Sequence, residues 1–574
     1  MKNFALRIWT LVGFLFLANL TIAQTILFNT SWNNKYQHTL SNNFSNEARK
    51  IVANPSNGFV YVLADVTSDI DSNGVQGTQT FNYTVLLQFD TLGNILNEVV
   101  INVGAHSVAG FDRSSGFGLE LDATGNVYIG YNTFSSVNSY DVNIGKYTSN
   151  LSEVWTYQFN PTSSDVGIDM KVSTTSIAYC IVKSIGSGGA VRHRIIRAFG
   201  PGSATTTYFN FTITNDYYTS LAIDNGQFLY LAGYRPSAVT GTGKLISTAC
   251  ISTGSSPFLK WSSIDNCGTV AGDDVARHIV VGPDGFLYMV GYSTGNVQHG
   301  IDAFTFKLAP STGKKVWENF INNTLTDGAF LVNVPDISTV NVGWTSGSVA
   351  FVEQINTSTG LSTRRVPYAP TPLSPYTSIG QTTITGMVTS TIGKNVYLTG
   401  TITANNAGQS FEAAWLVKFN FSSRSSTPRI ENAASVEGSY TQSKRASGLA
   451  LSNSNTNVYW VRDLAENQAN HLQEKVEISS LEGTGTFRFG TEMHSEHSKD
   501  RIAFANPVSN VLQISSVDQM NRIQVLDITG KILLESTQTS NYQILEAQQL
   551  PAGVYHVVVV HNDGFTTIKP FVKH

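Results

Sequence analysis

The sequence predicts an all-β protein in which a seven- or eight-bladed β-propeller, with eight blades favoured, precedes a small Ig-like antiparallel β-sandwich. Three observations lead to this fold class. Charged residues make up only 13% of the 574 residues, whereas glycine is abundant (48 residues) and aromatic residues reach 11%, a balance that suits short strands and tight turns. A strand motif built on tyrosine recurs through most of the chain, and a different pattern begins at residue 501.

The first element is a predicted secretory signal peptide over residues 1–23. Lys2 and Arg7 form a positive start, residues 8–20 an apolar segment and residues 21–23 a small-residue cleavage pattern, which are the three parts of such a peptide. The apolar run is short for a membrane span, so we expect no transmembrane span in the mature chain. The net charge is −4 without a long run of either sign, which argues against nucleic acid as a partner.

Residues 24–488 form the predicted propeller. Each repeat has a turn followed by an apolar-aromatic strand, and the spacing between successive anchor residues ranges from 51 (Tyr128 to Tyr179) to 67 (Tyr61 to Tyr128). A period of this length is typical of a propeller or another repeat array. The eight anchors are Tyr61, Tyr128, Tyr179, Tyr230, Tyr288, Val340, Tyr397 and Tyr459.

Each anchor strand has partners on both sides in the sequence. A short strand with apolar alternation precedes it, as in IDMKV and RHIVV, and a hairpin follows it, most clearly in DAFTFKLAPSTGKKVWENF. Two hairpins give four strands per unit, which is the composition of a propeller blade. Because a ring must join its first and last blades, we expect the segment 25–37 to complete the last blade and remove two exposed edges.

The segment 272–295, GDDVARHIVVGPDGFLYMVGYSTG, resembles the bacterial β-propeller repeat called SBBP. That family has an acidic pair, an apolar strand, Asp-Gly, and a Tyr-containing strand that ends in glycine. The match is good in this unit, fair in four others and poor around Tyr179, Gly343 and Tyr459. The resemblance implies a propeller but no particular chemistry, since propellers host both binding and catalysis.

From residue 501 alternating apolar strands joined by turns predict a small antiparallel sandwich over residues 501–574. It contains, in order, FANPVSNVLQI, IQVLDITGKILL and LPAGVYHVVVV. These blocks closely resemble the C-terminal type A sorting domain of the type IX (Por) secretion system of Bacteroidota. Phe504 stands where that family more often has tyrosine. The residues that carry the resemblance are Asn506, Pro507, Gly530, Lys531, Gly553 and Tyr555, with Lys569 and Lys573 at the basic end.

The resemblance implies export through Sec into the periplasm, passage across the outer membrane by the type IX machinery, and either surface attachment or release. The alternative is an Ig-like adhesion domain that stays attached. Residues 489–500 are predicted to form a polar linker. This linker contains His494, Glu496 and His497, which could suggest a metal site, but a solvated hinge is the favoured interpretation because a metal site needs a rigid scaffold.

One stretch of the propeller region suggests calcium. Asp69, Asp71 and Asn73, followed by Gly74, place oxygen ligands on alternate residues around a glycine turn, as calcium loops do. Thr80 stands where a bidentate acid is expected, so an ordinary Asx turn is the favoured alternative. No other cofactor is predicted.

Other polar and aromatic residues have structural interpretations. The pair Asp273–Asp274 is expected to cap a turn and a strand, Trp317 to pack between blades, and the arginine-rich run 192–197 to form a half-exposed strand. The odd number of cysteines excludes full internal pairing; Cys180 is expected to be a buried thiol, and Cys250 and Cys267 could form a local bridge.

The predicted function is that of a secreted or surface-attached module that binds a polysaccharide or a protein through the loops of a rigid ring. No catalytic residue is predicted, because no hydrolase, zinc-protease or phosphate-binding motif occurs, and a non-enzyme is favoured. The alternative is a secreted polysaccharide hydrolase or lyase with acidic residues in the propeller channel, for which two carboxylates about 5–10 Å apart would be the mark.

Overall fold

The computed structural model describes residues 30–36 and most of residues 46–482 and 502–573, with short gaps that lie mainly between strands. The chain divides into two compact units, residues 1–485 and 486–574. The described residues of both units are built from antiparallel β-sheets. They contain no helix that is long and apolar enough to cross a membrane.

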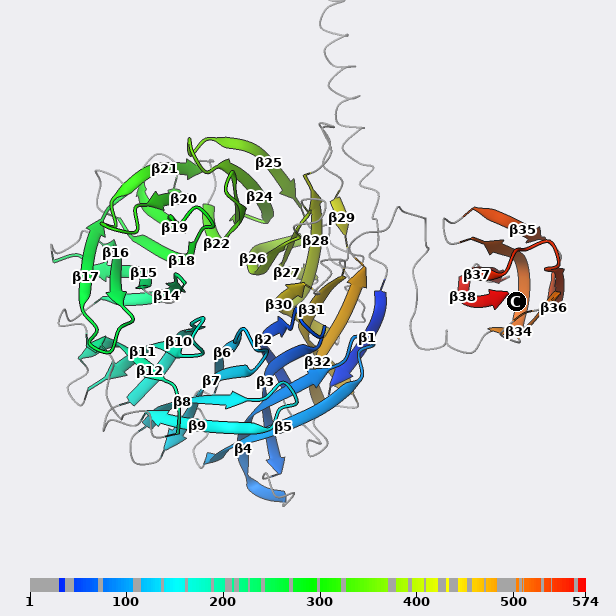
Figure 1. Cartoon of the computed structure of the whole chain (residues 1–574), viewed down its shortest axis with the longest axis horizontal. Helices are drawn as coiled ribbons and strands as arrows, with labels where there is room; N and C mark the ends of the chain where they lie inside the picture. Colours follow the sequence, from blue (N-terminus) through cyan, green and yellow to red (C-terminus); the bar gives the residue numbers. More distant parts are fainter. Residues whose placement is uncertain are drawn as a thin grey trace, which may run out of the picture. The chain divides into compact units, whose positions relative to one another are not determined.

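The described part of the first unit contains eight sheets of four strands each (Figure 1). In seven of them the four strands follow one another in the chain. These strands are β2 (Asn46–Ala53), β3 (Val60–Ile70), β4 (Gln76–Phe89) and β5 (Ile95–His106); β6 (Gly116–Leu121), β7 (Val127–Ser135), β8 (Ser139–Tyr147) and β9 (Glu153–Phe159); β10 (Ser164–Val172), β11 (Ala178–Ile185), β12 (Val191–Ala198) and β13 (Phe209–Asn210); β14 (Tyr217–Ile223), β15 (Phe228–Pro236), β16 (Lys244–Ser252) and β17 (Leu259–Asp265); β18 (Asp274–Val281), β19 (Leu287–Asn296), β20 (Gly300–Leu308) and β21 (Lys315–Ile321); β22 (Asp327–Asp336), β23 (Thr339–Ser346), β24 (Val349–Asn356) and β25 (Ser362–Tyr368); β26 (Ser378–Thr389), β27 (Asn395–Asn406), β28 (Gln409–Asn420) and β29 (Ile430–Asn432).

The eighth sheet joins the two ends of the first unit. Its order is β30 (Gln442–Leu451), β31 (Asn457–Gln468), β32 (His471–Glu482) and then β1 (Thr30–Tyr36). β1 pairs antiparallel with β32, for example Asn34 opposite Ile478. The predicted completion of the last repeat by the N-terminal strand is therefore confirmed.

The first strand of each sheet faces the centre of the unit, and these inner strands contact one another in sequence order (Figure 1). β2 contacts β6, β6 contacts β10, and the series continues to β30, which contacts β2 again. The contacts therefore close into a ring. Each inner strand is one that the sequence pattern predicted ahead of an anchor, and each anchor lies in the second strand of its sheet.

The anchor tyrosines are buried and join neighbouring sheets. All seven are at most 2% exposed, and burying an aromatic side chain of this size is strongly stabilising. The Tyr61 hydroxyl donates to the carbonyl of Ser149 at 2.7 Å, and the Tyr128 hydroxyl donates to that of Ser176 at 2.8 Å, in each case in a turn of the next sheet. Tyr61 and Tyr128 therefore supply both apolar area and an inter-sheet hydrogen bond, whereas the hydroxyls of Tyr230 and Tyr288 donate to Asp224 and Asp284 in turns of their own sheets.

Tryptophan has the same role in the fourth strands of two sheets. Trp317 Nε1 donates to the carbonyl of Thr357 at 2.8 Å, and Trp261 Nε1 donates to that of Pro310 at 2.9 Å, each in the following sheet. The Trp317 ring also lies 6.0 Å from the Tyr288 ring. The structural interpretation of Trp317 is confirmed.

A register shift occurs at the same place in all eight sheets. In each inner strand, two residues that pair with consecutive residues of the second strand are separated by one extra residue. This is the pattern of a β-bulge, which bends a strand and re-aims a side chain. The bulged residues are Arg49, Phe117, Ile168, Thr219, Arg277, Phe330, Thr385 and Ser447.

The acidic pair of the repeat makes local contacts. Asp273 Oδ2 lies 2.6 Å from Lys244 Nζ, and Asp274 Oδ2 accepts a hydrogen bond from the Cys267 amide at 3.1 Å. Asp274 is the first residue of β18. The Asp274 contact agrees with the predicted capping role, whereas the Asp273 carboxylate forms an ion pair with Lys244.

The cysteines are all free thiols: Cys180 and Cys250 are buried and Cys267 is half-buried. The possible Cys250–Cys267 bridge is therefore absent. The arginine-rich run forms β12, in which the arginines are exposed or half-buried while His193 and Ile195 are buried, as expected for a half-exposed strand.

The second unit has one six-stranded antiparallel sheet organised around a long strand. β34 (Val511–Leu526) pairs with β33 (Ile502–Ala503) and β36 (Ser540–Glu546) along its first half and with β35 (Ile532–Ser536) and β37 (Gly553–His561) along its second half; β38 (Thr566–Lys573) pairs with β37. The apolar residues of both halves share one core, which includes Leu512, Ile514, Val525, Val557 and Phe571. The unit therefore has its own hydrophobic core.

Candidate functional site

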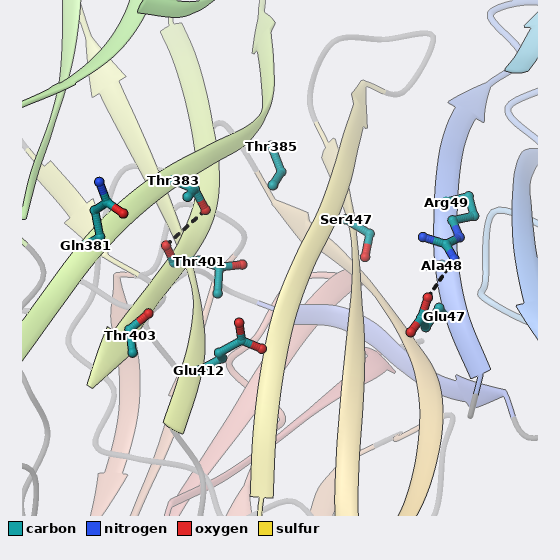
Figure 2. Close-up of a pocket in the computed structure, with 10 residues that line it drawn as sticks. All are labelled: Glu47, Ala48, Arg49, Gln381, Thr383, Thr385, Thr401, Thr403, Glu412 and Ser447. Atoms are coloured by element: carbon teal, nitrogen blue, oxygen red, sulfur yellow. Dashed lines mark hydrogen bonds and ion pairs between the residues drawn. The ribbon is translucent and has the colours of Figure 1, made fainter. Parts of the chain in front are cut away.

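A polar pocket of about 380 Å³ lies at the inner strands of three neighbouring sheets of the first unit (Figure 2). These sheets begin with β26, β30 and β2, so the pocket spans the place where the ends of the ring meet. Its lining residues are Glu47, Ala48 and Arg49 of β2, Gln381, Thr383 and Thr385 of β26, Thr401 and Thr403 of β27, Glu412 of β28, and Ser447 of β30.

The hydroxyl groups reach the pocket because β26 alternates. Gln381, Thr383 and Thr385 are exposed, whereas Thr382 and Ile384 between them are buried, since successive residues of a strand point to opposite faces. Thr383 Oγ1 donates to the carbonyl of Thr401 at 3.3 Å (Figure 2). Three of the lining residues, Arg49, Thr385 and Ser447, are bulged residues. The shared bulge therefore contributes directly to the pocket wall.

Arg49 is held in place by two carboxylates. Its Nη2 lies 2.7 Å from Glu47 Oε2, and its Nε donates to Asp65 Oδ2 at 2.7 Å. Asp65 is buried and also accepts hydrogen bonds from the Gly116 amide (3.1 Å) and Thr84 Oγ1 (3.2 Å). Burial raises the pKa of Asp65 to about 6 although Arg49 opposes the shift. These contacts fix the guanidinium at the pocket edge.

The lining is rich in groups that hydrogen-bond to hydroxyls. Figure 2 shows Glu412 with the threonine hydroxyls of β26 and β27 on one side of Ser447, and Glu47 with Arg49 on the other. Carboxylates accept hydrogen bonds, a guanidinium donates them and hydroxyls do both. Among the lining residues only Ala48 is apolar. The pocket therefore suits a polyhydroxylated ligand better than an apolar one.

The predicted calcium ligands are only partly described. Asp69 lies near the end of β3, while Asp71 and Asn73 lie outside the described residues. Within the part of the chain that the structure describes, no group of three or more His, Cys, Asp or Glu side chains could hold a metal ion. Asp71 and Asn73 lie outside that part, so the calcium loop stays a prediction.

The predicted sorting residues lie in the second unit. Asn506, Pro507 and Gly530 are outside the described residues, and Lys531 precedes β35. Gly553 of β37 pairs with Lys573 of β38, and Val557 pairs with Lys569.

Tyr555 holds the start of β37 in two ways. Its hydroxyl donates to the carbonyl of Pro551 at 2.7 Å, and its ring lies 5.7 Å from that of Phe571. Phe504, at the position where tyrosine is commoner, packs edge-on against the same Phe571 ring at 6.2 Å. The departure from the family pattern is therefore accommodated in the apolar core.

Sequence reasoning missed the pocket residues. It predicted the strands that carry them, ARKIVA and ITGMV, but assigned no role to Glu47, Thr383 or Glu412. The alternating polar residues in QTTIT were the available signal, because the first strand of each repeat is the one that faces the centre of the ring.

The fold defines the class of molecule: a closed ring of four-stranded sheets followed by a separate C-terminal unit. Residues 503–574 match the family model described as "Secretion system C-terminal sorting domain". The C-terminal segment is therefore a type IX sorting domain, and the chain is addressed to the cell surface or to secretion. No curated protein matches the chain.

Several solved structures are similar in fold. The Dos1 propeller shares 9% identity over 79% of this chain and 95% of its own, with a TM-score of 0.35. Prolyl oligopeptidase B from Galerina marginata shares 10% identity over 74% of this chain and 56% of its own, with a TM-score of 0.37. A protein of unknown function from Dyadobacter fermentans shares 12% identity over 59% of this chain and 97% of its own, with a TM-score of 0.30. At these values the likenesses carry no argument about activity.

Proposed function

We propose that this chain is an exported, non-catalytic eight-bladed propeller that binds carbohydrate at the mouth of its ring. The eight blades are supported by eight sheets with the same strand arrangement, one shared bulge position and inner strands in closed contact. The binding role is supported by the pocket, whose wall combines carboxylate, guanidinium and hydroxyl groups on the inner strands. A carbohydrate is favoured over a protein ligand because the lining residues carry hydrogen-bonding groups and include no aromatic or large aliphatic side chain that could receive an interface anchor.

The remaining parts of the proposal concern export. Residues 1–23 act as the signal peptide, residues 24–488 as the propeller, residues 489–500 as the linker and residues 501–574 as an Ig-like sorting unit. The host is a member of the Bacteroidota, and the propeller is attached to the outer-membrane surface or released. The match of residues 503–574 to the sorting family supports this order.

A glycan array with the exported protein tests the binding role. We expect binding to a subset of polysaccharides, and Glu412→Gln should weaken it about three- to tenfold because a charged hydrogen bond contributes roughly 1.5–3 kcal/mol, reduced here by exposure of the site. Glu98→Gln is the matched control, since Glu98 is an exposed acid on the fourth strand of its sheet. An array without any bound glycan, or equal losses in both variants, would contradict the proposal.

One observation favours a second candidate, a polysaccharide hydrolase or lyase. Glu47 and Glu412 line the same pocket, and most glycoside hydrolases use a pair of carboxylates. The test is release of reducing ends from the polysaccharides that the array identifies. Release that is lost in both Glu47→Gln and Glu412→Gln would replace the binding role by catalysis, and its absence in the wild type would remove the enzyme candidate for those substrates.

A further inference from the structure

A second cluster of side chains borders the same mouth of the ring on three other sheets. Tyr217 of β14 lies two residues before the bulge and faces Tyr234 of β15, in the same way that Thr383 faces Thr401 in the pocket. Arg277 is the bulged residue of the next inner strand, β18. The registers therefore place this cluster and the pocket at the same end of the inner strands.

The cluster is built from half-buried aromatic rings and two cations. The Tyr217 and Tyr234 rings are stacked with centroids 5.0 Å apart and planes 8° apart, and Lys244 Nζ lies 5.2 Å from the Tyr234 ring. The Arg277 guanidinium lies 4.9 Å from the Tyr292 ring and 4.3 Å from the Phe330 ring. The cluster therefore presents partly exposed aromatic rings beside cations, which is a combination of groups found in ligand-binding surfaces.

The two cations differ in their partners. Lys244 Nζ is neutralised by Asp273 at 2.6 Å. In the described residues Arg277 makes no ion pair with a carboxylate; its guanidinium lies over the Tyr292 and Phe330 rings and interacts with the Tyr292 hydroxyl. No Asp or Glu occurs in the short undescribed segments between the strands of these three sheets, namely 226–227, 239–242, 268–271, 297–299 and 322–326.

This arrangement is unusual for a structural arginine. Burial lowers the pKa of Arg277, yet arginine stays charged in proteins, so among the described residues this half-buried positive charge has no carboxylate partner. A guanidinium on an aromatic surface keeps its planar donor fork, which matches carboxylate and sulfate groups.

We infer that this cluster binds an anionic sugar unit, with Arg277 donating to the acidic group and the half-exposed tyrosine rings covering one face of the sugar. The inference rests on the proposed carbohydrate-binding function and specifies its ligand class. The acidic group can be a uronate carboxylate or a sulfate ester, which share the same recognition chemistry. The pocket on the other three sheets then accommodates neighbouring hydroxyl-rich units.

Isothermal titration calorimetry with three oligosaccharides of equal length tests the inference. The probes are an oligogalacturonate, the same oligosaccharide with its carboxyl groups reduced to alcohols, and a sulfated oligogalactan. We expect the wild-type protein to bind at least one anionic probe about tenfold or more tightly than the neutral one, the factor that a charge-assisted hydrogen bond supplies. Whether the oligogalacturonate or the sulfated probe binds distinguishes the two sources of the acidic group.

Two variants separate Arg277 from general charge effects. Arg277→Gln should reduce binding of the anionic probe about tenfold or more and leave the neutral probe unchanged. Lys260→Gln is the matched control, because Lys260 also lies over an aromatic ring, Phe228 at 3.8 Å, but on the fourth strand β17. Arg277→Lys, which keeps the charge and loses the fork, should fall between the wild type and Arg277→Gln.

The outcomes distinguish the inference from the proposed function. If the wild type binds neutral and anionic probes equally, or if Arg277→Gln and Lys260→Gln behave alike, the anionic site is wrong while carbohydrate binding stands. If no probe and no arrayed glycan binds, the proposed function itself is wrong. If Arg277→Gln melts at a lower temperature than Lys260→Gln, Tyr217→Leu replaces it as the test variant. Tyr217→Leu should weaken binding of both the anionic and the neutral oligosaccharides, and unchanged binding of both would contradict the site.

Discussion

In several sheets of the ring, single residues connect one sheet to the next through the turn that precedes the fourth strand of that next sheet. Trp317 shows the arrangement most clearly, because its Nε1 donates to Thr357 and its ring lies over Gly360 of the same turn. Gly360 has a φ of +71°, and a Cβ at this position would lie 2.7 Å from the Trp317 ring. Both the backbone conformation and the close approach therefore require glycine.

The first prediction concerns this contact. Gly360→Ala should lower the free energy of unfolding by about 1–3 kcal/mol, because alanine is strained at positive φ and its methyl group would displace the tryptophan ring. Gly254→Ala is the control, since a Cβ there would meet nothing within 4 Å and should change stability by less than about 0.5 kcal/mol. Denaturant unfolding of both variants measures the difference; equal stabilities would contradict the role of this contact.

The second prediction concerns His193, which is 2% exposed and accepts a hydrogen bond from the Tyr218 amide at Nδ1. Burial lowers its pKa to about 4, below the unfolded value of about 6.5. The native state therefore excludes a proton that the unfolded state binds. The resulting stability is fully present above pH 6.5 and is lost as the pH falls to 4, by about 3 kcal/mol.

His193→Asn isolates this effect, because the asparagine side chain keeps an acceptor near Nδ1 but does not titrate in this range. The unfolding free energy of the wild type should decrease more steeply between pH 6.5 and 4 than that of the variant. Parallel pH profiles would show that His193 is protonated in the native state or that other groups dominate.

At the residue level the sequence predicted the roles of residues that fit a known repeat motif. It missed the positions where a different residue type makes the equivalent contact. Trp317 was interpreted as a packing residue because it follows a Thr-Gly turn, and it is one. Arg364 occupies the same place in the next sheet and donates to the carbonyl of Phe421 at 3.1 Å, but an exposed-strand arginine carries no signal for that contact. His193 was grouped with arginines, since alternation alone does not separate its buried position from a solvated one.

At the level of elements, hydrophobic alternation predicted the inner strand and the anchor strand of every repeat. The bulges were not predicted, because a bulge depends on how a strand pairs and bends within its sheet, and bulged residues as different as Arg49 and Phe117 have no common sequence signature. The pocket was also missed, because it too depends on how strands come together in the folded ring. Its residues come from strands that are distant in the chain and adjacent only after the ring closes.

The third prediction concerns the closing strand. Deleting residues 24–36 removes β1 and exposes the edge of β32, and free edges lower stability and promote association. The truncated protein should melt several degrees lower and form concentration-dependent oligomers, as measured by calorimetry and size-exclusion chromatography. Deleting residues 24–29 alone, which leaves β1 (Thr30–Tyr36) intact, is the control. A truncated protein that stays monomeric with an unchanged melting temperature would show that closure does not depend on β1.

At the scale of the whole molecule, the two units have separate cores and separate tasks. The core of the second unit contains only residues of that unit, so this unit can fold without the propeller. The sequence predicted this division because the tyrosine-anchored repeat stops and a different strand pattern begins at residue 501. It could not predict which ligand the propeller meets, since that depends on side chains that converge from separate sheets.

The last prediction follows from that division. A reporter protein fused to residues 486–574 behind a signal peptide should leave the periplasm of a type IX-competent host, because the matched sorting segment lies wholly within this folded unit. Val557→Asp, which places a charge at a fully buried core position, should unfold the unit, since an unpaired buried charge costs several kcal/mol. If export requires the folded sheet, this variant stays periplasmic, whereas Val554→Asp, at a position that is 50% exposed on the same strand, is exported normally.

Export is measured as reporter activity in the medium and on intact cells, compared with a host that lacks the type IX machinery. Export of the Val557 variant would show that short unfolded motifs suffice, and retention of the unaltered fusion would show that the propeller contributes to the address.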